Sequence, residues 1–102
     1  MVAMKHKKEV TLIAVKNNSD EEIFGVQMKI DDGKIRFVKA RGWDRDRIDQ
    51  STVIVQTTDR PIKAIKSLIL IMMVDNRTSA YEWTVFDTGG NIMAEEDIRP
   101  RS

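Results

Sequence analysis

Apolar and polar residues alternate along much of the chain, and this period of two predicts β-strands. Residues 23–30 separate the two faces most clearly, because the even positions carry apolar side chains: Phe24, Val26, Met28 and Ile30. Further stretches rich in β-branched or aromatic residues predict strands at 10–15, 52–57 and 81–86. The pattern therefore favours a protein built mainly from strands.

A turn signal follows the clearest strand. Asp31, Asp32 and Gly33 stand between two alternating runs, and an Asp-Gly pair in that position is typical of a tight hairpin because glycine adopts positive φ without steric strain. The sequence thus predicts a strand at 34–40 that pairs back on 23–30. Within that strand Ile35 and Phe37 share one side.

Residues 41–50 break the period of two with alternating charges. We interpret them as a long surface connection anchored by Trp43 and Ile48. A second turn signal, at 87–91, contains two adjacent glycines. It predicts a tight turn leading to a short edge strand at 92–94.

The stretch 61–74 fits two structures. Asp59 could cap a helix in which Ile62, Ile65 and Ile69 repeat at helical spacing. Residues 67–74 are equally typical of a central strand buried on both faces. The strand is favoured, and an α+β fold with a helix at 61–74 stays open as the alternative.

Together these elements predict an all-β fold, an antiparallel sandwich of about seven strands spaced at intervals of about ten residues. A single domain would cover 9–94, preceded by a flexible basic segment at 1–8 and followed by a polar tail at 95–102 that frays.

Four segments carry a resemblance to a known architecture. They are the opening strand that ends in Asn17-Asn18-Ser19, the strand at 23–30, the bend at 57–62 before a hydrophobic strand, and the closing segment 81–87 with its Gly-Gly turn. In this arrangement the chain resembles immunoglobulin-like and fibronectin-type-III-like β-sandwich modules over residues 9–94. The resemblance implies a binding or spacer module without catalysis.

Charge and composition narrow the function classes. The 102 residues include 17 Lys and Arg against 16 Asp and Glu, a net charge of +1, which creates no long-range field for nucleic acid or membrane surfaces. The longest uncharged apolar run, 68–74, is far shorter than the roughly 20 residues of a membrane span. We expect no membrane span, and the compartment stays open, including a cell-surface or secreted module whose leader lies outside this sequence.

Catalytic chemistry has few candidates. The single histidine, His6, lies among lysines in the N-terminal segment, so the hydroxyls of Ser51, Thr57 and Ser67 have no nearby base to activate them. The chain has no cysteine and therefore no thiol nucleophile or thiolate metal site. We expect a protein that is not an enzyme and that uses no cofactor.

One acidic spacing is compatible with a hard cation. Asp44, Asp46 and Asp49 could supply carboxylate oxygens to calcium from one loop. Arg45 and Arg47 stand between them, however, and can neutralise the carboxylates instead. A surface network of arginine and aspartate is favoured over a metal site.

Binding is the remaining function class. Large planar groups and guanidinium groups supply most of the energy at protein interfaces. This predicts a protein-binding surface on the 41–50 connection and the strand before it: Trp43, Arg41, Arg45, Arg47, Arg36 and Lys39. The partner is unknown, and an edge strand could also pair with a second copy of the chain.

Two points about this surface stay open. The basic and aromatic residues at 34–47 could instead hold single-stranded nucleic acid by phosphate pairing and base stacking. Trp43 could also be a plug that closes one end of the core. The second aromatic stripe, Tyr81 and Trp83 with Val85, is interpreted as half of the core.

Overall fold

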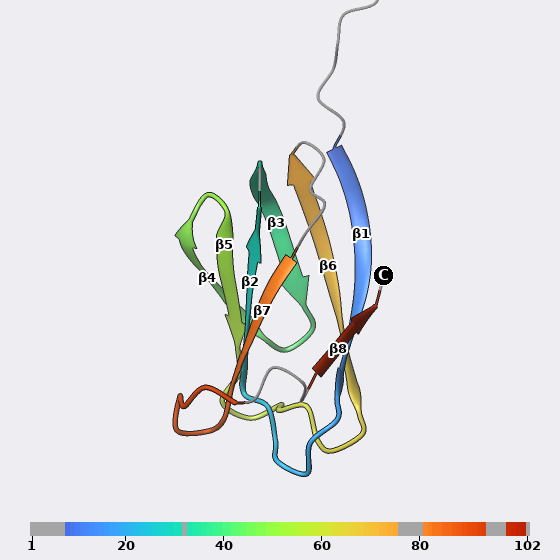
Figure 1. The fold of residues 1–102 in the computed structure, drawn as a ribbon, viewed down its shortest axis with the longest axis vertical. Coiled ribbons are helices and arrows are strands. Elements are labelled where there is room, and N and C mark those ends of the chain that lie inside the picture. The colour runs from blue at the N-terminus through green and yellow to red at the C-terminus, as the bar shows by residue number, and fades with distance from the viewer. Residues whose placement is uncertain (1–7, 32, 76–80, 94–97, 102) are drawn as a thin grey trace, which may run out of the picture.

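The computed structural model describes residues 8–31, 33–75, 81–93 and 98–101 (Figure 1). These residues form seven strands and a short eighth: β1 (Lys8–Asn17), β2 (Gly25–Ile30), β3 (Lys34–Ala40), β4 (Asp44–Asp49), β5 (Thr52–Gln56), β6 (Ser67–Asp75), β7 (Tyr81–Phe86) and β8 (Ile98–Arg101). The N-terminal segment 1–7 lies outside the described residues. The described residues include no helix, so the all-β prediction is confirmed.

The strands form two antiparallel sheets that face each other as a sandwich (Figure 1). Sheet A has the order β3-β6-β1-β8, and sheet C has the order β4-β5-β2-β7. β6 lies in the centre of sheet A, between β1 and β3. The strand interpretation of 67–74 is therefore confirmed, and the helix at 61–74 is wrong.

The core fills the space between the two sheets. Alternate residues of each strand point inward, as the period of two requires. The buried apolar side chains are Ile13, Val15, Ile23, Val26, Met28, Ile30, Ile35, Val38, Ala40, Trp43, Val53, Val55, Ile62, Leu70, Met72, Val74, Val85 and Met93. Val85 is buried and Trp83 packs against this cluster, which agrees with the interpretation of that stripe as core.

The predicted hairpin at 31–33 is wrong. β3 pairs with β6 in sheet A, whereas β2 pairs with β5 and β7 in sheet C. Gly33 has a φ of 95°, so the glycine does adopt the turn conformation that the sequence indicated. The turn carries the chain from sheet C to sheet A. Ile30 and Ile35 therefore enter the core from opposite sides.

A β-bulge changes the faces of β3. The register to β6 shifts between Ile35 and Phe37, which leaves Arg36 as the additional residue. As a result Ile35 and Val38 are both buried, and Phe37 is only half-buried. The expected pairing of Ile35 and Phe37 on one side is wrong for this reason.

Residues 41–50 are also more regular than the sequence indicates. β4 forms an antiparallel hairpin with β5, and every side chain of β4 is exposed. Alternating charges suit such an edge strand, because charged side chains discourage pairing with another chain. The interpretation of these residues as an irregular connection is wrong.

Asn17 ties the end of β1 to the loops beside it. The side chain is fully buried; its Nδ2 donates to the carbonyls of Glu21, at 2.6 Å, and Ile62, at 2.8 Å. Its Oδ1 accepts from the Ser19 backbone N–H and hydroxyl. A buried amide with all these partners holds the predicted turn after β1 against the bend before β6.

Two C-terminal segments pair with strands of the sandwich. Ile92 makes a single β-bridge to Phe86, and the Met93 N–H donates to the Val85 carbonyl, so this segment covers part of the β7 edge. β8, which the sequence placed in the polar tail, pairs with β1 from Asn17 to Ala14.

Candidate binding surfaces

Trp43, the first residue of the predicted binding surface, belongs to the core. It is 9% exposed, and its indole N–H donates to the Arg60 carbonyl at 2.9 Å. Gly42 makes this possible: its φ is +79°, and a Cβ there would lie 2.5 Å from Arg60 Cδ. Of the two interpretations of Trp43, the core plug is confirmed.

Arg45 and Arg47 close one side of the sandwich. β3 is the outer strand of sheet A, so the carbonyls on its free edge lack a neighbouring strand. Arg45 Nη1 donates to the Val38 carbonyl at 3.3 Å, and Arg47 Nη2 donates to the Ile35 carbonyl at 2.5 Å. We call these two contacts the arginine seam. Guanidinium groups suit this position because they carry several fixed donors.

Phe37 takes part in the same seam. The Arg45 guanidinium carbon lies 5.3 Å from the centre of the Phe37 ring, within the range of a cation–π contact. One face of the ring is therefore already occupied by a neighbouring side chain.

The remaining predicted residues lie on the outside. Arg36, Lys39 and Arg41 are all exposed. Arg36 stands at the bulge, Lys39 lies in β3 opposite Ile71 of β6, and Arg41 follows the end of β3. The structure thus separates the six predicted residues into one in the core, two in the seam and three on the surface.

The acidic spacing of β4 does not gather around one point. Asp44 and Asp46 pair with Gln56 and Ile54 of β5, and within the described residues no group of three metal-ligating side chains occurs. Asp49 instead holds the β4–β5 turn, accepting from the Ser51 N–H at 2.8 Å and from its hydroxyl at 3.0 Å. These hydrogen bonds lower the pKa of Asp49 below its ordinary value of 3.8.

Two of the three candidate hydroxyls, those of Ser51 and Thr57, have structural partners. The Ser51 hydroxyl donates to the Asp49 carboxylate in the exposed β4–β5 turn. The Thr57 hydroxyl accepts from the Arg60 N–H at 3.0 Å and so holds the bend after β5. His6 lies outside the described residues.

An exposed patch on sheet A was not predicted. Leu12 is 58% exposed, Ile69 is 52% exposed and Ile71 is 37% exposed. The register places Leu12 beside Ile71 and Ala14 beside Ile69, so these side chains form one surface across β1 and β6. We define the apolar face as these residues and Met73: Leu12, Ala14, Ile69, Ile71 and Met73.

The sequence held a signal for this face that we interpreted differently. Residues 68–74 are apolar throughout, and such a run is typical of a strand buried on both sides. β6 is central and its inner residues, such as Leu70, are buried, but its outer residues face outward from the sandwich. The expectation of burial on both faces is wrong for the described structure.

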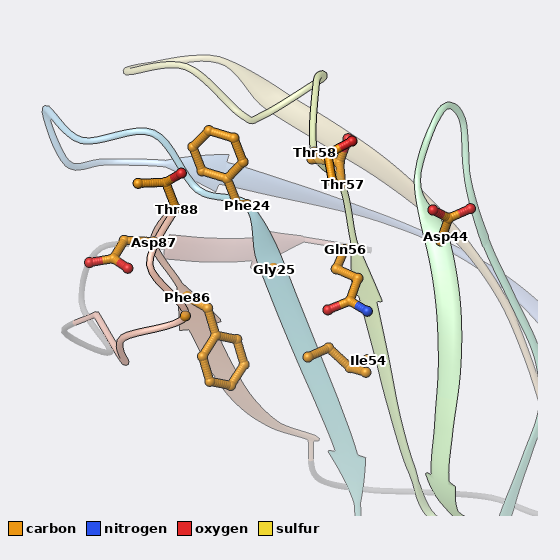
Figure 2. Close-up of a pocket in the computed structure, with 11 residues that line it drawn as sticks. Phe24, Gly25, Asp44, Ile54, Gln56, Thr57, Thr58, Phe86, Asp87 and Thr88 are labelled. Carbon is orange, nitrogen blue, oxygen red and sulfur yellow. The ribbon is translucent and has the colours of Figure 1, made fainter.

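A groove lies on the outer face of sheet C (Figure 2). Its cavity volume is about 510 Å³, and it is lined by Phe24, Gly25, Asp44, Ile54, Gln56, Thr57, Thr58, Phe86, Asp87, Thr88 and Gly90. Figure 2 shows the Phe24 and Phe86 rings on either side of Gly25, with Ile54 and Gln56 on the neighbouring strand. Phe24, predicted to share the buried face of its strand, is half-buried and lines this groove instead.

Gly25 lets the Phe86 side chain pack closely against β2. It pairs with Gln56 on one side and with Phe86 on the other. A Cβ at this position would lie 3.2 Å from Phe86 Cδ2 and 3.3 Å from Phe86 Cβ. The glycine is needed here for space.

No family model, curated protein or solved structure matches the chain. Within the part of the chain that the structure describes, no helix is long and apolar enough to cross a membrane.

Proposed function

We propose that this domain is a non-enzymatic protein-interaction module that binds its partner through the apolar face of sheet A. The observation that carries the proposal is the exposure of Leu12, Ile69 and Ile71 side by side on paired strands. Single exposed aliphatic residues are common on protein surfaces, but a contiguous group marks an interaction site. Protein binding is the function expected from the sequence, but the proposed binding surface is the apolar face and not the 41–50 region.

Charge selects the partner. Lys39 of β3 lies beside Ile71, and Lys16 continues the outer row of β1 after Ala14. Among the described side chains on the outside of sheet A, lysines border the aliphatic residues and no carboxylate does. The occupant is therefore a polypeptide segment with an apolar stripe flanked by Asp or Glu, because its charges complement this border.

The contacts of four further side chains support a binding role without catalysis. The hydroxyls of Ser51 and Thr57 hold turns, and Arg45 and Arg47 bond backbone carbonyls. These side chains are thus occupied by structural contacts.

The fold is consistent with the proposal of an immunoglobulin-like module. β1 pairs with β6 in one sheet, and β2 pairs with β7 in the other, which puts an early strand beside a late one in both layers. Sandwich modules of that kind serve mainly as binding or spacer units.

Single-stranded nucleic acid is the competing ligand. Arg36 and Lys39 of β3 and Arg41 directly after it offer three exposed cations. Sequence-tolerant binding of single strands also needs exposed aromatic faces. Trp43 is in the core and Arg45 covers one face of Phe37, so a protein partner is the better fit.

The test uses two synthetic helical peptides with the same leucine spacing, one with glutamate and one with lysine on the flanks. Amide chemical shifts of the isotope-labelled domain are followed during each titration. We expect the acidic peptide to shift residues of β1 and β6, and the basic peptide to bind at least about tenfold more weakly because lysines face lysines.

Two variants serve as controls for the peptide experiment. Ile69→Ala should weaken binding of the acidic peptide, whereas Ile92→Ala, which removes an aliphatic side chain 73% exposed and outside the apolar face, should leave it unchanged. Equal binding of both peptides, or shifts confined to β3 with an oligonucleotide as the only effective ligand, would contradict the proposal.

A further inference from the structure

The groove on sheet C differs from the apolar face in its chemistry. Its lining combines two phenyl rings with carboxylates, hydroxyls and one amide, and no lysine, arginine or histidine is among the lining residues. Its volume of about 510 Å³ falls in the range of small-molecule sites, about 300–1,000 Å³. An anionic ligand would have no counter-charge here, so the ligand is neutral or cationic.

The alternation of β4 sets the charge of this surface. Arg45 and Arg47 reach toward β3, where they bond carbonyls of sheet A. Asp44, at an alternate position, lines the groove. The neighbouring guanidinium groups are therefore held at the seam, and the outer side of the strand keeps its negative charge.

Carboxylates stand at both ends of one row across the sheet. Asp44 of β4 pairs with Gln56, Gln56 with Gly25, and Gly25 with Phe86, which Asp87 follows. Hydrogen bonds from the backbone N–H groups of Asn91 and Gly89 lower the pKa of Asp87 below its ordinary value. A positive group in the groove would be attracted by both carboxylates.

The aromatic walls suit the same ligand. The face of a phenyl ring carries partial negative charge, which attracts a cation and the polarised C–H groups around it. Phe24 and Phe86 are both half-buried, so parts of their rings stay accessible in the groove.

We infer that this groove binds an organic cation, an alkylammonium group that packs against the accessible parts of the Phe24 and Phe86 rings and is attracted by the carboxylates of Asp44 and Asp87. The site is separate from the apolar face and does not depend on the proposed function. It uses the outer face of the opposite sheet.

The experiment compares choline with its uncharged carbon isostere, in which a tert-butyl group replaces the trimethylammonium group. Binding is followed by amide shifts of the labelled domain, with glucose as a third probe. We expect choline to shift Gly25, Gln56 and Phe86, and the isostere to bind about fivefold more weakly, the loss of a cation–π contact at an exposed site. Added salt should weaken choline binding because the groove is open to solvent.

Variants test the walls and the charge separately. Phe86→Leu should weaken choline binding about fivefold. Asp44→Asn should weaken it less, and Glu82→Gln, which removes an exposed carboxylate of the same face outside the groove, should have no effect.

Three outcomes would overturn the inference. They are equal affinity for choline and its isostere, tighter binding of glucose than of choline, and the absence of shifts in the groove with every probe. In the second case the groove would be a site for neutral hydroxyl-rich ligands.

Discussion

Trp43 is 9% exposed, whereas Ile69 is 52% exposed, although the sequence suggested the reverse arrangement. The region around β4 carries aromatic and charged residues that are typical of an interface, yet Trp43, Arg45 and Arg47 mainly hold the molecule together. β6 carries the aliphatic run typical of a core, yet half of its side chains face outward. Residue type therefore predicts poorly which of these two regions is exposed for binding. The position of each strand within the sandwich predicts it well.

The physical reason lies in the edges. An outer strand has unpaired carbonyls, and long charged side chains can bond them, as the arginine seam does for β3. A central strand has no such need, and its outer side chains are free to serve a partner. Substitutions in and around these two regions test this contrast.

Trp43→Ala should lower the free energy of unfolding by about 3–5 kcal/mol, because it empties a large volume in the core and removes the hydrogen bond to Arg60. Chemical denaturation measures this effect. Arg41→Ala, two residues earlier and exposed, should stay within about 0.5 kcal/mol of the wild type. Unchanged stability of the Trp43→Ala domain would show that Trp43 is not part of the core.

Arg47→Met should cost about 1–2 kcal/mol, because it keeps most of the aliphatic stem but removes the charged donor from the Ile35 carbonyl. Hydrogen exchange at β3 amides should become faster in this variant. Unchanged stability and exchange would show that the arginine seam does not hold the two sheets together.

Ile65→Gly should raise stability by about 1 kcal/mol. Ile65 has a φ of 58° in the bend before β6, a conformation that strains a β-branched side chain and that glycine adopts freely. Ile65 is 74% exposed, so little packing is lost. A loss of stability would mean that the contacts of the Ile65 side chain stabilise the fold by more than the backbone strain costs.

Acid should weaken the β4 region through Asp49. Its pKa is lower in the folded state than its ordinary value of 3.8, so its contribution is present above that value and is lost as the pH falls through the lowered pKa. Asp49→Asn should therefore flatten the fall of the melting temperature at acidic pH. An identical pH profile for the variant and the wild type would show that Asp49 does not contribute to the loss of stability at acidic pH.

Ile69→Ala should change the free energy of unfolding by less than about 0.5 kcal/mol, because its side chain already faces water. Leu70→Ala, the next residue on the same strand, should cost about 2–5 kcal/mol because Leu70 is fully buried. Equal losses at the two positions would mean that the apolar face is covered within the domain itself, and the comparison would fail.

Strand existence was readable from local pattern. The alternation of 23–30 and the β-branched runs predicted β2, β5 and most of β1 and β7, because an inward-facing row needs an apolar residue at every second position. The turn residues were also recognised, as at Asp87, whose carboxylate accepts from Gly89 and Asn91.

The candidate surfaces depended on pairings that local pattern does not contain. Gly25, Gln56 and Phe86 line one groove only because they pair across neighbouring strands, and they are distant in the sequence. The seam likewise joins Arg47 to a carbonyl twelve positions earlier on the other sheet. The alternation of apolar and polar residues within one strand does not predict which strand will pair with it.

The amino-acid sequence by itself determined that this chain forms strands, where most of them turn, and which side chains of each strand can enter a core. The tertiary structure decided which sheet each strand joins, and with it the use of every outward side chain. A turn such as 31–33 fixes the local direction of the backbone, but the burial of Ile30 and Ile35 from opposite sides decides that it connects two layers. Function at the surface follows from that second decision, because neighbours across strands create the apolar face, the seam and the groove.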